Sequence, residues 1–143
     1  MEEPKIIQGG RHKDSRGILA FVNDFRLDEI KRFYTIEHID DSVVRAWQGH
    51  QKEKKWFYVL EGDFCIVLVQ PDDWANPSET LPIREIILKA NDSQILYIPS
   101  GYANGFKALQ PNSKLLVFSN FTTEESADDN FRFDKDKWFN WSK

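Results

Sequence analysis

The stretch RAWQGHQKEKKWFYVLEG, residues 45–62, joins a polar cluster to an aromatic and aliphatic run that is typical of a β-strand. A second apolar run, FCIVLV at 64–69, follows after a very short break. Two such runs predict a β-hairpin in which Gly62 adopts a positive φ angle. The polar residues then form either a solvated turn or the polar floor of a binding pocket.

Other short apolar runs lie on both sides of this stretch and also read as strands. They are GILAFV (17–22), FYTI (33–36), VVRAW (43–47), IREIIL (83–88), QILYIP (94–99), GFKAL (105–109) and KLLVF (114–118). Because they are too short and too β-branched for a helical bundle, we expect a mostly β domain that closes into a sandwich or barrel. One helical turn is expected within 24–32 and a short terminal helix within 134–141.

The composition excludes several classes of partner. A chain of 143 residues is expected to form one domain, residues 1–143. Its net charge of −4 lacks the basic excess that nucleic-acid binding needs. No apolar run approaches the roughly 20 residues that span a membrane, and the first ten residues hold no signal region, so a cytoplasmic location is expected. The single cysteine, Cys65, makes no internal disulfide and reads as a buried apolar residue.

Strand alternation assigns side chains to faces. Gln48 and His50 share one face of their strand, because side chains alternate with period two. On the next strand Lys55, Phe57 and Val59 alternate with Trp56, Tyr58 and Leu60. Both faces of that strand are therefore expected to be covered, either by a second sheet on each side or by a partner subunit, and a homodimer is favoured.

Six motifs occur in one order along nearly the whole chain. They are DSRG (14–17), IKRFYTI (30–36), VVRAWQGH (43–50), KWFYVLEG (55–62), YIPSGYANGF (97–106) and NFRFDKD (130–136). Together they resemble the small cupin-fold enzymes of deoxysugar nucleotide biosynthesis, the dTDP-4-dehydrorhamnose 3,5-epimerases and the dTDP-4-keto-6-deoxyglucose 3,4-ketoisomerases. The resemblance implies an all-β cupin, a double-stranded β-helix or jelly-roll barrel.

The resemblance also bears on metals. The positions that hold ligands in a metal-binding cupin carry Gln48, His50, Lys55 and Asn104 in this chain. One histidine, two amides and a lysine make a poor site for a divalent ion. We therefore expect no metal and no other cofactor, and a metal-dependent cupin dioxygenase is disfavoured.

Catalytic residues follow from the same resemblance. His50 falls on the second histidine of the ketoisomerase motif and would be the base, with Tyr34 beside it, and Lys55 falls on the lysine that stabilises the enolate. Gln48 occupies the position of the epimerase base and Val117 lies near that of its acid tyrosine. A double epimerase is therefore disfavoured, whereas a single epimerisation or a 3,4-keto isomerisation through an enediol stays open.

Further residues are expected to bind the substrate. Arg45 suits a pyrophosphate at the rim, and Arg16 resembles an arginine that reaches the nucleotide phosphate from a neighbouring chain. Gln48, Asn104 and Tyr102 would contact the ligand. Asp134 or Asp136 could orient the His50 imidazole, and the other two histidines, His12 and His38, are expected to be exposed.

Each assignment has a structural alternative. His50 could be a hydrogen-bonded structural residue, Tyr34 a core residue, and Lys55 one more solvated charge beside Lys52, Glu53 and Lys54. The function predicted is an epimerase or 3,4-ketoisomerase acting on a nucleotide-linked, dTDP-type 4-keto-6-deoxyhexose. The alternative is a catalytically inactive cupin module that binds a sugar or a sugar nucleotide.

Overall fold

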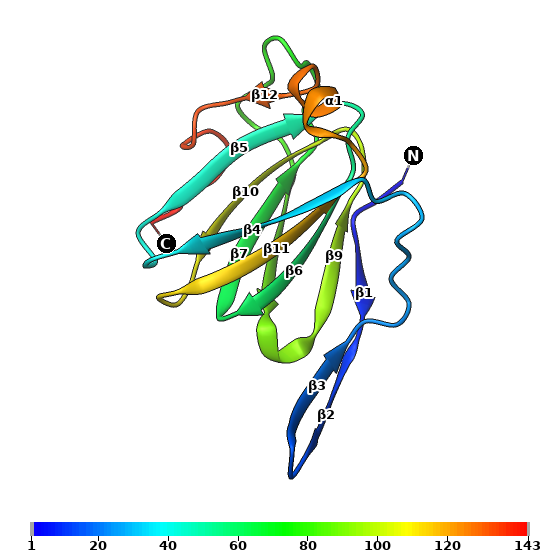
Figure 1. The fold of residues 1–143 in the computed structure, drawn as a ribbon. Coiled ribbons are helices and arrows are strands. Elements are labelled where there is room, and N and C mark those ends of the chain that lie inside the picture. Colours follow the sequence, from blue (N-terminus) through cyan, green and yellow to red (C-terminus); the bar gives the residue numbers. More distant parts are fainter. Residues whose placement is uncertain (1, 143) are drawn as a thin grey trace.

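The computed structural model describes residues 2–142 and is built almost entirely from antiparallel strands (Figure 1). The strands are β1 (Lys5–Gln8), β2 (Gly10–Asp14), β3 (Gly17–Phe21), β4 (Arg32–His38), β5 (Val44–His50), β6 (Lys55–Glu61), β7 (Asp63–Val69), β8 (Ile83–Lys89), β9 (Gln94–Ile98), β10 (Tyr102–Ala108), β11 (Ser113–Ser119) and β12 (Phe131–Arg132). A 3-10 turn, η1 (Ala90–Asp92), and one helix, α1 (Thr123–Ala127), complete the described residues.

Two five-stranded sheets form the barrel, with strand orders β1-β9-β6-β11-β4 and β12-β5-β10-β7-β8. From β8 to β11 the chain crosses from one sheet to the other at every step, as in a jelly roll. The all-β jelly-roll fold expected from the sequence is therefore confirmed. β4 and β12 are edge strands of the two sheets, and β12 pairs with β5, the strand that carries the polar cluster.

The expected hairpin of β6 and β7 is wrong. β6 pairs with β9 and β11, whereas β7 pairs with β8 and β10 in the other sheet. Gly62 does have a positive φ, of 74°, but it turns the chain across the barrel rather than back on itself. A Cβ at Gly62 would lie 2.0 Å from Oγ of Ser113, so only glycine fits this corner.

The core lies between the two sheets, where inward side chains such as Phe57, Phe64 and Phe106 are buried together. Cys65 is buried as expected, but on the other face of its sheet. That outer face is covered by the C-terminal segment, which packs Phe139 and Trp141 against Trp47. The outer face of the other sheet is also apolar, since Trp56, Ile95 and Tyr97 are buried together there.

The single helix of the described residues lies where none was expected. α1 starts with a capping box, in which the Thr122 side chain accepts from the backbone N–H of Glu125 and the Glu125 carboxylate accepts from that of Thr122. The expected helical segments do not form helices, because 24–31 and 134–141 are turns and irregular chain and β4 begins at Arg32. No helix among the described residues is long and apolar enough to cross a membrane.

The hairpin of β2 and β3 projects away from the barrel (Figure 1). It contacts the rest of the chain near its base, where Arg11 donates to the carbonyl oxygen of Ala90. Leu19, near the tip, is 63% exposed. An exposed apolar arm of this kind is typical of a segment that packs on another molecule.

Candidate active site

A cavity of about 420 Å³ lies between the two sheets, with walls from β4, β5, β6, β10, β11 and β12. This volume is in the range of small-molecule sites. Three cations, Arg45, Lys55 and Arg132, line it. Among the described residues of its wall none is acidic, so the cavity is suited to an anionic ligand.

Lys55 lies inside the barrel and is only 3% exposed, so it is not a solvated charge. Its Nζ donates to Oε1 of Gln48 at 2.9 Å and lies 6.0 Å from the centre of the Tyr34 ring. Burial lowers the pKa of Lys55 to about 8, although the charge of Glu53 opposes this shift. An ammonium group with few partners is therefore placed beside a phenol in the cavity.

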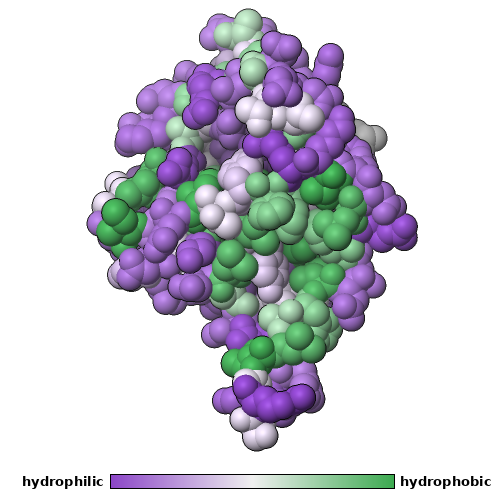
Figure 2. All heavy atoms as spheres, viewed as in Figure 1, coloured by the Kyte–Doolittle hydropathy of each residue, from purple (hydrophilic) through white to green (hydrophobic). Residues whose placement is uncertain are grey.

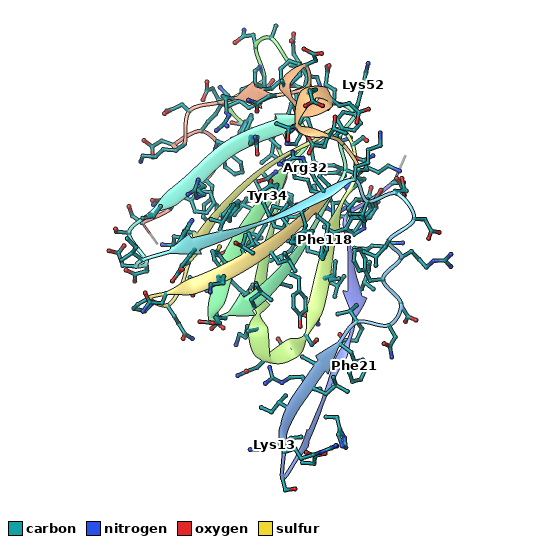
Figure 3. All side chains as sticks on the ribbon, in the orientation of Figure 1. Lys13, Phe21, Arg32, Tyr34, Lys52 and Phe118 are labelled. Carbon is teal, nitrogen blue, oxygen red and sulfur yellow. The ribbon has the colours of Figure 1, made fainter. Side chains whose placement is uncertain are left out.

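Tyr34 lines the cavity from β4 and is half-buried rather than a closed core residue. Arg32, two residues earlier on the same face, places its guanidinium 5.1 Å from the Tyr34 ring centre, and Figure 3 labels the two side chains on this strand. Burial raises the pKa of the Tyr34 hydroxyl, so the group is a protonated phenol at neutral pH.

His50 lies inside the barrel at the end of β5 and is 3% exposed. Its Nδ1 is 2.8 Å from the backbone carbonyl oxygen of Asp129. Because a carbonyl only accepts, Nδ1 carries the proton and Nε2 keeps its lone pair. Nε2 is buried and has no hydrogen-bond partner among the described residues. Burial, followed by the charge of Lys55, lowers the pKa of His50, so the imidazole is a neutral base.

The wall of the cavity does not include His50. Gln48, two residues earlier on the same face of β5, lines the cavity in front of it. Asn104 is opposite Gln48 in the β5–β10 register and donates to its carbonyl oxygen at 3.3 Å. Both amides therefore lie in the cavity as expected, and His50 lies behind them.

Glu53 is a buried carboxylate that the sequence analysis missed. Its Oε1 lies 3.3 Å from Nδ1 of His50 and accepts from Ser126 at 2.7 Å. Its Oε2 accepts from Ser119 at 2.6 Å and from Arg32 at 3.3 Å. The only signal in the sequence was the spacing of three residues from His50, hidden in a run of charged residues.

No hydrogen bond or ion pair joins His50 to Asp134 or Asp136, the expected orienting carboxylates. Asp136 pairs with Lys135 at 3.1 Å on the exposed C-terminal segment. The aspartate at this end of the barrel is Asp129, whose carboxylate accepts the backbone N–H groups of residues 51, 52 and 53. It therefore fixes the turn that carries Glu53, while its carbonyl fixes His50.

Arg45 lines the cavity at the opposite end of β5 and donates from Nε to Nε2 of His38 at 3.1 Å. The expectation that His38 is exposed is wrong, since it is 1% exposed and packs between Phe64 and Phe106. Alternation along β4 explains this, because His38 shares the inward face of Tyr34.

Three further residues complete the comparison with the sequence. Tyr102 is buried opposite His50 in the strand register and does not line this cavity. Arg16 is at the tip of the β2–β3 hairpin, where it pairs with Asp14 at 2.7 Å. Arg132 was not singled out, although it lies within the motif NFRFDKD, and β12 places it in the cavity wall opposite Gln48.

The donor set does not suit a metal ion. Within residues 2–142 no group of three or more histidine, cysteine, aspartate or glutamate side chains is placed to hold one. The expected cupin ligand positions gather around Lys55, whose ammonium would repel a divalent ion.

Comparison with known proteins identifies the family. The sequence model of the dTDP-4-dehydrorhamnose 3,5-epimerase family matches residues 1–141. No curated protein matches the sequence significantly. Among solved structures, the TDP-quinovose 3,4-ketoisomerase WlaRB of Campylobacter jejuni is 23% identical, with a TM-score of 0.73 over 93% of this chain and 95% of that one. The dTDP-4-dehydrorhamnose 3,5-epimerase of Bacillus anthracis is 19% identical, with a TM-score of 0.77 over 97% and 85%.

A third similar structure is the sugar 3,4-ketoisomerase QdtA of Thermoanaerobacterium thermosaccharolyticum, 23% identical, with a TM-score of 0.72 over 91% of this chain and 88% of that one. At these identities the structures show that the fold is shared. The family match covers nearly the whole sequence. The chain therefore belongs to the dTDP-4-dehydrorhamnose 3,5-epimerase family.

Proposed function

We propose that this protein is a sugar-nucleotide isomerase that moves one proton on a dTDP-linked 4-keto-6-deoxyhexose, as a 3,4-ketoisomerase or a single epimerase. The observation that carries this proposal is a cavity that holds Lys55 and Tyr34 and has no acidic wall residue among those described. Behind it lies Nε2 of His50, which has no hydrogen-bond partner in the same part of the chain. The similar QdtA structures include complexes with TDP and with TDP-4-keto-6-deoxyglucose. We infer a ligand of the same class here.

The proposed chemistry balances without a co-reactant. His50 removes the proton from carbon 3 of the 4-keto sugar, and the electron pair moves onto the oxygen at carbon 4 as an enediolate. Lys55 stabilises the developing negative charge. Return of the proton to carbon 4, with transfer of the hydroxyl proton from oxygen 3 to oxygen 4 through Tyr34, gives the 3-ketone.

Two residues support one proton transfer rather than a double epimerisation. Gln48, at the position of the epimerase base, is an amide and cannot abstract a carbon-bound proton. Val117 lines the cavity and donates nothing. Among the described wall residues, these two positions therefore do not supply the base and the acid that a double epimerisation would need on opposite faces of the sugar ring.

We assign phosphate binding to the two arginines of the cavity wall. Arg45 and Arg132 lie on β5 and β12, and both line the cavity. A guanidinium binds phosphate oxygens in a bidentate manner, so the two arginines suit a diphosphate. Gln48 and Asn104 would then contact the sugar.

The alternative function, a sugar-nucleotide-binding module without turnover, is favoured by one observation. His50 does not belong to the cavity wall, and its Nε2 is buried. Contact between this nitrogen and a substrate therefore requires neighbouring side chains to move.

The decisive experiment is to incubate the protein and its His50→Ala variant with dTDP-4-keto-6-deoxyglucose in heavy water and to follow the proton spectrum. We expect a 3-keto product, or loss of the signal at carbon 3 or 5, with the wild-type protein alone. An unchanged spectrum with broadened ligand lines would instead support the binding module. If the protein neither turns over this ligand nor broadens its lines, the result would contradict the proposed substrate class.

We also propose a homodimer formed through the outer face of the β1-β9-β6-β11-β4 sheet. Phe33 on this face is 69% exposed, and it packs beside Phe118. Figure 2 shows apolar side chains gathered over this side of the molecule, and Figure 3 labels Phe118 there. The projecting hairpin could then carry Arg16 toward the partner's cavity.

Sedimentation tests the dimer. The wild-type protein is expected at twice the chain mass of 16.8 kDa, and a Phe33→Glu variant at the monomer mass, because burying a carboxylate in an apolar interface is costly. A monomeric wild-type protein would contradict the proposal.

We place the protein in the cytoplasm, since its one cysteine makes no internal disulfide and fits a reducing compartment.

A further inference from the structure

We propose that His38 is a positioning residue for ligand binding. By accepting a hydrogen bond from Nε of Arg45, its imidazole holds the guanidinium at the cavity so that the two terminal nitrogens remain available for a diphosphate. This inference rests on the proposed function only for the identity of the ligand.

The hydrogen bond joins the two sheets beside the cavity. His38 is the last residue of β4, the edge strand of one sheet, and Arg45 is the second residue of β5 in the other. Their nitrogen atoms are 3.1 Å apart. This hydrogen bond to a buried residue restricts the conformations of the Arg45 side chain, which would otherwise be those of a long flexible chain.

The chemistry of the pair fixes the protonation of His38. Arginine nitrogens only donate, so Nε2 of His38 accepts and Nδ1 carries the proton. Nδ1 is buried and has no partner among the described residues. Burial and the charge of Arg45 both lower the pKa of His38, and the charge of Asp40 only partly opposes this, so the ring is neutral at pH 7.

A simple packing role does not account for this arrangement. The His38 ring lies nearly parallel to Phe106, with centroids 5.8 Å apart, and edge-on to Phe64 at 5.4 Å. A phenylalanine or leucine would fill such an apolar space without burying an unpartnered N–H group, which is costly. The nitrogen that accepts from Arg45 is therefore the feature that distinguishes histidine at this position.

A neutral anchor has an advantage over an acidic one. Arg32 shows the contrast, because its guanidinium pairs with the Glu53 carboxylate and its charge is largely satisfied within the protein. No carboxylate among the described residues lies within 4 Å of Arg45. The imidazole orients the guanidinium through Nε and leaves its full positive charge for an anionic ligand.

The test is a double-mutant cycle on binding of dTDP and of inorganic pyrophosphate, measured by calorimetry. The variants are His38→Phe, Arg45→Ala and the two combined. His38→Phe keeps an aromatic ring between Phe64 and Phe106 but lacks the acceptor. We expect it to weaken binding roughly tenfold in the wild-type background and to have no effect in the Arg45→Ala background, because the two residues act as a unit.

His38→Gln is the matched control. Its side-chain oxygen can accept from Arg45, so binding is expected to recover toward the wild-type value. Near-ultraviolet circular dichroism of each variant reports whether the core stays folded.

The outcomes separate this inference from the proposed function. Equal weakening by His38→Phe in both backgrounds, or no weakening in either, would overturn the role of His38 while leaving the isomerase intact. If the wild-type protein binds pyrophosphate but not dTDP, the nucleotide ligand would be contradicted. The double-mutant cycle measured with pyrophosphate would still decide the role of His38. A wild-type protein that binds neither ligand would overturn both.

Discussion

The two ends of β5 each bring a buried histidine into contact with an ionised group, and the two groups have opposite charge. At one end His50 has the Glu53 carboxylate 3.3 Å from Nδ1. At the other end Nε2 of His38 accepts from the Arg45 guanidinium. Both rings are neutral and nearly inaccessible, and each has one nitrogen without a partner among the described residues.

The difference lies in which form of the ring the neighbour favours. A carboxylate beside Nδ1 stabilises the imidazolium that forms when Nε2 takes a proton, which is what a general base requires. A guanidinium at Nε2 opposes protonation and keeps that nitrogen an acceptor. Two histidines of similar burial are therefore suited to different tasks, one to proton transfer and the other to holding a cation.

Replacing His50 should produce the largest effect of this comparison. His50→Asn can still donate to the Asp129 carbonyl but offers no base. We expect turnover of dTDP-4-keto-6-deoxyglucose to fall by about 10²–10⁴, the usual contribution of a general base, while the affinity for dTDP stays near the wild-type value. Kinetics and calorimetry measure the two quantities.

His38→Phe should show the reverse pattern, with KM rising more than kcat falls. The same split in both variants would remove the distinction between the two histidines. It would show instead that both variants act through a general loss of structure.

Lys55 is the cation at the His50 end, as Arg45 is at the other, and Lys55→Met should have the next largest effect. Loss of one group that stabilises an oxyanion costs about 10²–10³ in turnover. With a pKa of about 8, Lys55 is charged below that pH, so wild-type kcat/KM should fall as pH rises through about 8. This alkaline limb should be absent from the variant.

The same substitution should stabilise the fold. The pKa of Lys55 is about 8 in the folded protein against 10.5 ordinarily, so burial of the charged form costs about 3 kcal/mol below pH 8, and this cost is relieved as pH rises from 8 toward 10.5. At pH 7 we expect Lys55→Met to raise Tm, because it removes the cost of burying the charge. Loss of the hydrogen bond to Gln48 should offset part of this gain. Lys54→Met is the control and should not raise Tm, because Lys54 is partly exposed and already forms an ion pair with Glu29. If the alkaline limb of kcat/KM is unchanged in Lys55→Met, the limb belongs to the titration of another group.

Strand alternation predicted much of the cavity. Lys55 and Gln48 lie in its wall because each shares the inward face of its strand, and the family motifs placed Arg45 and Asn104 correctly near them. The same rule applied to β4 would have turned His38 inward with Tyr34, but its polar neighbours in the sequence suggested a surface position.

Other features depend on contacts between distant segments and have no local signal. Glu53 is buried because Arg32, Ser119 and Ser126 reach it from elements far along the chain. The apolar runs around Gly62 are compatible with a hairpin and with a crossover, and only pairing with β9 to β11 decides between them.

Glu53→Gln should have the smallest effect on turnover and tests the charge at the His50 end most directly. The Glu53 charge raises the pKa of His50, so its removal should lower that pKa and shift the acid limb of kcat/KM to lower pH, since activity requires the neutral ring. The variant keeps the side-chain shape, but mismatched hydrogen bonds to Ser119 and Ser126 should cost about 1–3 kcal/mol of stability. A pH–rate profile and a denaturant titration measure the two effects separately. An acid limb that stays in place while stability falls would show that Glu53 only fastens the turn, and the two histidines would then differ in their partners but not in their tuning.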